Sequence, residues 1–113
     1  MNVTTATLGD VVVLQVNEPR LTYPILGDFA SAAANLIGSG QKKIVVDLTP
    51  VGYVDSATIG CLMDLYRQAT SSGSALKLAG VQKRVETMLT MTGAHNFLEV
   101  HADQASALAS FGV

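Results

Sequence analysis

The sequence has few of the residues needed for a disulfide, a reactive thiol or a metal site. It contains one cysteine, Cys61, two histidines and no tryptophan among 113 residues. A single cysteine cannot form an internal disulfide, and its place in an apolar stretch predicts a small core residue. No His, Cys, Asp or Glu residues follow the spacing of metal ligands, so we expect neither a metal nor a cofactor.

Charged residues are also scarce. They make up 14% of the chain against 49% hydrophobic residues, and the net charge is -2. This balance excludes a disordered chain and predicts one folded domain over residues 1–113. Lys and Arg form no basic stripe, so we expect no nucleic-acid partner. No apolar run is long enough to span a membrane and no signal peptide is recognisable, which predicts a cytoplasmic protein without membrane contact.

Residues for serine-hydrolase chemistry are largely missing. Such an enzyme needs a base beside its nucleophile, and His95 and His101 are the only histidines. Ser56 lacks the Gly-x-Ser-x-Gly pattern that exposes a nucleophilic serine on a strained turn. We therefore expect no catalytic residues and a protein that binds rather than catalyses.

Hydrophobic periodicity predicts strands that alternate with helices. The expected strands are Val3–Leu8, Val11–Val16, Ile44–Leu48, Ala75–Ala79 and Phe97–Val100. The expected helices are Tyr23–Ile37, a helix that starts at Asp55-Ser56 and stops at Ser71-Ser72-Gly73, a short one from Val81 to Thr92, and Ala102–Phe111 with Ala105, Leu108 and Ala109 inward. This order predicts an α/β fold with a mixed sheet of about five strands and helices mostly on one side.

The junction at Asp55-Ser56 is where chemistry and architecture coincide. Both residue types favour the first turn of a helix, where a side-chain oxygen can accept from free backbone N–H groups. A hydroxyl at this positive helix end could also carry a phosphoryl group. Two interpretations of Ser56 follow: it only caps the helix, or it is a modification site.

The second helix has a glycine in its interior. A glycine in a helix interior, such as Gly60, lowers helix stability by about 1 kcal/mol relative to alanine. Either close helix packing or the approach of a partner could offset that cost. Thr58, which we expect to be exposed, adds a second hydroxyl to the same turn.

Several stretches of the sequence resemble the STAS domain, and together they cover nearly the whole chain. They are Val46–Leu48, Val54–Leu62, Gly73–Val81 and the similar segment Val85–Leu108. The most specific part is the Asp-Ser dipeptide at a strand-to-helix junction, followed by Gly60 and Leu62. Within the family, the chain looks like the short, single-domain bacterial anti-anti-sigma factors (anti-sigma factor antagonists).

The resemblance implies a phosphorylation switch at Ser56. In that family, a partner that is both a serine-protein kinase and an anti-sigma factor modifies this serine, and a phosphatase reverses the change. The unphosphorylated protein binds the anti-sigma factor and frees the sigma factor. The resemblance also implies a monomer or weak dimer, and partner binding at the following residues: Asp55, Ser56, Ala57, Thr58 and Gly60.

Two other roles stay open. One is a scaffold STAS subunit of a stressosome-like complex, and the other, which the presence of Ser56 disfavours, is a STAS subunit of a lipid transporter. The chain also departs from the family pattern in two places. It has Ala57 and Thr58 after the Asp-Ser pair, and Asn17–Leu21 where relatives often have Gly-x-Leu-Asp in a loop that contacts the kinase.

Overall fold

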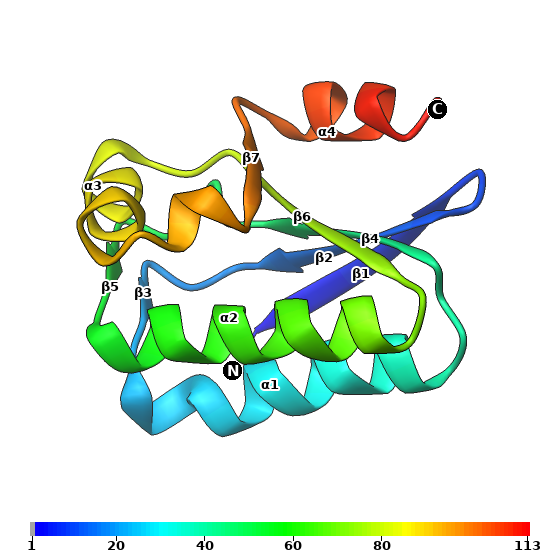
Figure 1. Cartoon of the computed structure of the whole chain (residues 1–113). Coiled ribbons are helices and arrows are strands. Elements are labelled where there is room, and N and C mark those ends of the chain that lie inside the picture. Colours follow the sequence, from blue (N-terminus) through cyan, green and yellow to red (C-terminus); the bar gives the residue numbers. More distant parts are fainter. Residues whose placement is uncertain (1) are drawn as a thin grey trace.

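A mixed β-sheet forms the centre of the protein (Figure 1). The structure is a computed structural model and describes residues 2–113. The strands of this sheet lie in the order β1-β2-β4-β6-β7, with β1 antiparallel to β2 and all other pairs parallel. The elements are β1 Val3–Leu8, β2 Val11–Val16, β3 Arg20–Leu21, α1 Tyr23–Gly38, β4 Lys43–Asp47, β5 Tyr53–Val54, α2 Ser56–Ser71, β6 Ala75–Ala79, α3 Lys83–Thr92, the short helix η1 Ala94–Asn96, β7 Glu99–His101 and α4 Gln104–Ser110.

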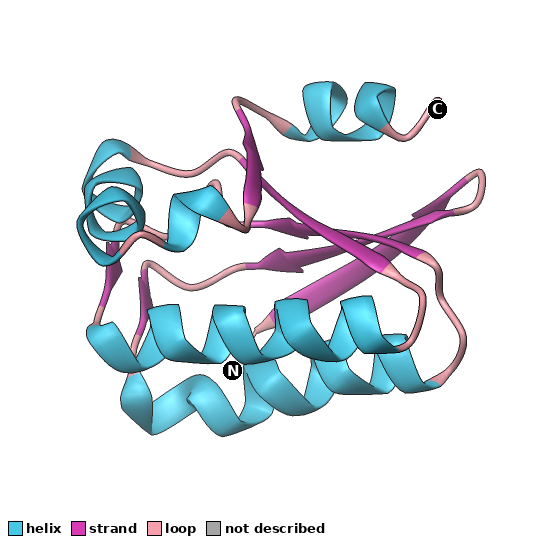
Figure 2. Cartoon of the chain, viewed as in Figure 1, coloured by secondary structure: helices cyan, strands magenta, loops and turns pink. Residues whose placement is uncertain are grey.

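Helices pack on both faces of the sheet, most of them on one face. Helices α1 and α2 lie side by side under one face, and α4 crosses the other face (Figure 2). Helix α3 lies at one end of the sheet and packs Val85 and Leu89 into the same core as α1 and α2. The main core lies under the first face, and its largest fully buried side chains include Phe29, Leu14, Ile44, Leu62 and Leu78. The prediction of a mixed five-stranded sheet with helices mostly on one side is confirmed.

A second, two-stranded sheet was not predicted. Strands β3 and β5 run parallel, with Arg20 opposite Tyr53 and Leu21 opposite Val54. Each has two residues, too few for a period of two to appear in the sequence. This small sheet places the start of α1 next to the start of α2, because β3 leads into α1 and β5 leads into α2.

The C-terminal segments differ from the prediction. The last strand is Glu99–His101, and Phe97 lies before it with 58% of its surface exposed, its ring centroid 6.4 Å from that of Tyr66. In α4, Ala107 is buried whereas Ala105 and Ala109 are exposed. The helix starts at Gln104, after the Asp103 cap, and an alanine-rich turn has no large apolar residues to indicate its buried face.

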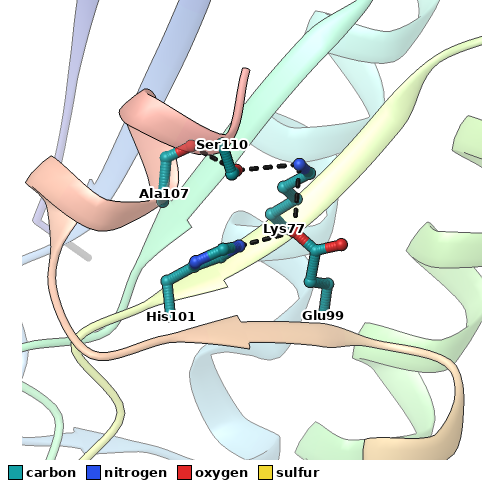
Figure 3. Close-up of polar contacts among 5 residues, drawn as sticks. All are labelled: Lys77, Glu99, His101, Ala107 and Ser110. Atoms are coloured by element: carbon teal, nitrogen blue, oxygen red, sulfur yellow. Dashed lines mark hydrogen bonds and ion pairs between the residues drawn. The ribbon is translucent and has the colours of Figure 1, made fainter. Parts of the chain in front are cut away.

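A polar cluster fixes α4 to the sheet (Figure 3). The Lys77 ammonium on β6 donates to Ser110 Oγ at 2.8 Å and lies 2.9 Å from Glu99 Oε2 on β7. His101 Nε2 lies 2.5 Å from the same carboxylate oxygen. Lys77 also lies over the Phe111 ring at 4.1 Å. Polar contacts therefore supplement the small apolar interface beneath α4.

Candidate partner-binding site at the Asp55-Ser56 junction

The Asp55 carboxylate joins the first turns of two helices. Its Oδ1 accepts from the Thr58 backbone N–H at 3.0 Å, which makes Asp55 the N-cap of α2. Its Oδ2 accepts from the Tyr23 backbone N–H, also at 3.0 Å, at the first residue of α1. Thr22, the N-cap residue of α1, makes no side-chain cap hydrogen bond of its own. One carboxylate thus satisfies free N–H groups at both helix starts.

The same contacts set the charge of the site. The hydrogen bond from the Tyr23 backbone N–H, followed by those from the Thr58 side chain and backbone, lowers the pKa of Asp55 below its usual value. A carboxylate that accepts several such bonds is favoured in its ionised form. Asp55 is therefore negatively charged at neutral pH, and two helix N-termini lie against it.

Thr58 lies inside the protein, and the expectation that it is exposed is wrong. The residue is fully buried. Its Oγ1 lies 2.6 Å from the Leu21 carbonyl oxygen and 2.8 Å from Asp55 Oδ1, so its single hydrogen is shared between two acceptors. Thr58 therefore connects the end of β3 to the cap of α2 and offers no hydroxyl to a partner at the surface.

Ser56 is the first residue of α2 and is exposed. The interpretation of Ser56 as the cap is wrong, because Asp55 occupies that position and makes the capping bond. The Ser56 hydroxyl has no hydrogen-bond partner among residues 2–113. Its oxygen is therefore accessible at the point where the two helix starts meet.

An open groove of about 840 Å³ runs between α1 and α2. Most of its walls are small side chains: Gly27, Ala30, Ser31, Ala34, Ala57, Gly60 and Cys61. Tyr23, 75% exposed, also lines it. Two of the predicted partner-binding residues, Ala57 and Gly60, thus lie in one depression at the Ser56 end of α2.

Gly60 lies in the wall of this groove and is not required for helix packing. A Cβ added to Gly60 would have nothing within 4 Å, so close packing of helices does not require glycine at this position. That explanation is overturned, and the approach of a partner remains. Cys61, predicted as a core residue, is half-buried in the groove wall, where burial and then Asp64 raise the pKa of its thiol.

Neither histidine contacts Asp55 or Ser56. His101 pairs with Glu99 on β7, and His95 Nδ1 lies 3.4 Å from the Leu89 carbonyl oxygen. Across residues 2–113, no group of three or more His, Cys, Asp and Glu side chains is placed to hold a metal ion. Within that same range, no helix is both long and apolar enough to cross a membrane.

Sequence reasoning identified Asp55 and Ser56 but missed two other parts of this surface. Tyr23 was predicted only as the start of a helix, although an exposed aromatic residue at a helix start is a recognisable signal. Arg20 and Arg84, which lie over the Tyr53 ring, come from distant segments. No local pattern connects them.

The architecture defines a class of small α/β domains in which a mixed sheet supports a solvent-exposed junction between two helix starts. Residues 2–107 match the family model of the STAS domain. The chain therefore belongs to the STAS domain family, as its resemblance predicted.

Solved structures share this fold at low sequence identity. An anti-sigma factor antagonist from Mycobacterium paratuberculosis has a TM-score of 0.88 at 14% identity, with 96% of this chain and 92% of that chain covered. An anti-sigma-factor antagonist (STAS) domain protein from Planctomyces limnophilus has a TM-score of 0.88 at 16% identity, with 98% of each chain covered. The Bacillus cell fate determinant SpoIIAA in its phosphorylated form has a TM-score of 0.74 at 12% identity, with coverage of 97% and 99%.

Proposed function

We propose that this protein is an anti-sigma factor antagonist that works by reversible binding and is switched off by phosphorylation of Ser56. The observation that supports this most directly is the exposed, unpartnered Ser56 hydroxyl beside the Asp55 carboxylate, at the meeting point of two helix starts. The proposed partner is a serine-protein kinase that is also an anti-sigma factor. A phosphatase restores the binding form.

The switch acts on surface charge rather than on the fold. A phosphoryl group adds about -1.5 to -2 charge at neutral pH. Asp55 already accepts from Tyr23 N–H and Thr58 N–H, so the new group does not replace an existing cap. It places like charge beside the ionised Asp55 and increases the negative charge that faces the partner. Binding to a partner fitted to the neutral hydroxyl is then weakened by repulsion and by the added bulk.

Solved structures with the same fold also support this role. Proteins with this fold include anti-sigma factor antagonists, and SpoIIAA has been solved in a phosphorylated form. We propose the same class of partner here, with the protein acting in the cytoplasm as a monomer or weak dimer. We propose that the protein has no enzymatic activity of its own. Incubation with a serine-directed fluorophosphonate tests this, because an enzyme that used Ser56 as a nucleophile would be labelled and a binding protein would not.

Transfer of phosphate from ATP tests the proposal. The purified protein is incubated with ATP and each ATP-binding anti-sigma factor of its source cell, and the modified residue is located by mass spectrometry. We expect phosphate on Ser56 and none in Ser56→Ala. Ser31→Ala is the matched control, because Ser31 is also exposed and lines the same groove. Two results would contradict the proposal: phosphate on Ser31 instead of Ser56, or no phosphate on either serine with any of the kinases tested.

A further inference from the structure

Two guanidinium groups lie over one tyrosine ring beside the Asp55-Ser56 junction. Arg20 Cζ is 4.4 Å from the centroid of the Tyr53 ring, and Arg84 Cζ is 5.8 Å from it. The three residues come from β3, β5 and α3, so only the fold brings them together. We refer to Arg20, Tyr53 and Arg84 as the arginine cluster.

Apart from their contact with the Tyr53 ring, the two guanidinium groups have no charged partner among the described residues. Most other cationic side chains have a partner: Lys43 with Asp10 at 2.6 Å, Arg67 with Asp64 at 2.8 Å, Lys77 with Glu99 at 2.9 Å, and Lys42 with the Ser72 carbonyl oxygen at 3.0 Å. Among the described residues, Arg20, Arg84 and the neighbouring Lys83 form no ion pair. All three are exposed. The chain has a net charge of -2, yet these three cations have no acidic partner among the described residues.

Two of these cations also stand where helix electrostatics disfavours them. Lys83 and Arg84 are the first two residues of α3. A helix N-terminus has a partial positive charge, which favours acidic side chains and disfavours basic ones. Arg84 therefore does not stabilise α3 through its charge. A role outside the fold gives this placement a reason.

The arginine cluster borders the proposed switch. Tyr53 precedes Asp55 by two residues, and Arg20 precedes Tyr23, whose N–H binds the Asp55 carboxylate, by three. The pairing of β3 with β5 holds Arg20 opposite Tyr53. The chain positions and this pairing therefore place the arginine cluster close to Ser56, within reach of a partner that contacts Ser56.

We infer that the arginine cluster is a docking surface for an acidic segment of the protein partner. The inference rests on the proposed function for the identity of that partner. Stacking on Tyr53 restricts the guanidinium groups before binding, which lowers the entropy cost of ordering them. Each guanidinium keeps N–H donors that match a carboxylate in pairs.

The cluster fits carboxylates better than nucleic acid. Stable nucleic-acid binding neutralises about 6–10 phosphates. The cluster offers two cations, with Lys83 next to Arg84 in the sequence, on a chain with a net negative charge. The Tyr53 ring, the aromatic surface on which a base could stack, already has both guanidinium groups over it. An acidic protein segment needs neither a long track of cations nor a free ring.

The first experiment measures binding of each ATP-binding anti-sigma factor of the source cell to four forms of the full chain. These are wild type, Arg20→Glu, Arg84→Glu and the control Lys42→Glu, which makes the same charge change at the far end of α2. We expect both arginine variants to lose about tenfold in affinity at low salt, mainly through a slower association rate, and the loss to shrink in 0.5 M salt. Lys42→Glu should bind as wild type does. Arg84→Glu should unfold at an equal or higher temperature than wild type, which separates docking from folding.

The outcomes distinguish this inference from the proposed function. If a kinase binds and Ser56→Asp weakens that binding while both arginine variants bind as wild type does, the inference is wrong and the proposed function stands. If no kinase binds, a titration with decaglutamate followed by NMR decides. Shifts at the Arg20, Tyr53 and Arg84 amides that disappear in the variants support acidic docking without that partner. No shift at these amides, or a larger effect from a single-stranded oligonucleotide of equal charge, overturns it.

Discussion

Asp55 accepts a hydrogen bond from the backbone N–H of Tyr23, 32 residues before it in the chain, at 3.0 Å. The same carboxylate caps α2 through the Thr58 N–H. This relationship fixes the start of α1 against the start of α2. It also places Ser56, the next residue, where the two helix ends meet. The geometry of the proposed switch therefore depends on one carboxylate.

Replacement of Asp55 by Ala should destabilise the protein by about 2 kcal/mol, because an N-cap contributes about 1 kcal/mol and two helix starts lose an acceptor. Urea denaturation measures the loss. Asp103→Ala is the matched control, since Asp103 caps only the short helix α4 through the Ser106 N–H at 2.7 Å. A loss for Asp55→Ala no greater than that of the control would contradict the double-cap account.

Acid should weaken the fold through the same carboxylate. Hydrogen bonds from Tyr23 and Thr58 lower the folded-state pKa of Asp55, and those from His101 and then Lys77 lower that of Glu99. Groups with a lowered folded-state pKa contribute stability that is complete above their unfolded values, about 3.9 for Asp and 4.3 for Glu, and is lost as the pH falls through the folded-state values. Urea midpoints between pH 7 and pH 2.5 measure this loss. In Asp55→Asn the decline below about pH 4.5 should be shallower, and an unchanged slope would contradict the assignment.

Leu62 tests the packing of α2 on the sheet. Its side chain is fully buried in the main core. Leu62→Ala should cost about 2–5 kcal/mol through lost transfer free energy and the cavity left behind. Met63→Ala, in the half-buried position next to it, is the control and should cost less. A loss below about 1 kcal/mol for Leu62→Ala would mean that the buried face of α2 is assigned wrongly.

Gly60 should separate stability from binding. A Cβ at this helix position has open space around it, so Gly60→Ala should stabilise the fold by up to about 1 kcal/mol. The added methyl group narrows the groove and should weaken partner binding. Gly27→Ala offers a comparison on the opposite wall, also with nothing within 4 Å. If Gly60→Ala binds the partner as tightly as wild type, the glycine is not there for a partner's approach.

Much of the fold could be predicted from local patterns. The apolar runs of β2 and β4, the alternation of strands with helices, and Gly93 at the end of α3 all follow from periodicity and backbone preference. The two-residue strands β3 and β5 are too short to give such a pattern. The prediction of the buried face of α4 was wrong, because a run of alanines does not indicate which side of the helix faces the core.

The candidate site could be predicted only in part. The Asp-Ser pair is a local signal of a helix start, and it correctly located the junction. Which of the two residues caps the helix depends on side-chain direction, and here Asp55 does so while Ser56 faces solvent. The burial of Thr58 depends on the Leu21 carbonyl oxygen, 37 positions earlier. Such long-range contacts follow from the fold rather than from spacing in the sequence.

Ser56 itself contributes little to stability, because it is exposed and makes no capping bond. Ser56→Ala should change the free energy of unfolding by less than about 0.5 kcal/mol. Ser56→Asp should also fold, since an acidic residue in the first turn is favoured by the helix dipole. The two variants therefore report on binding without a change in fold.

The most direct test is a calorimetric titration of wild type, Ser56→Ala and Ser56→Asp against the kinase-type anti-sigma partner, with and without ATP. The account predicts that wild type binds and is released after ATP is added, that Ser56→Ala binds under both conditions, and that Ser56→Asp binds weakly under both. Equal binding by all three forms, unchanged by ATP, would contradict the phosphorylation switch at Ser56.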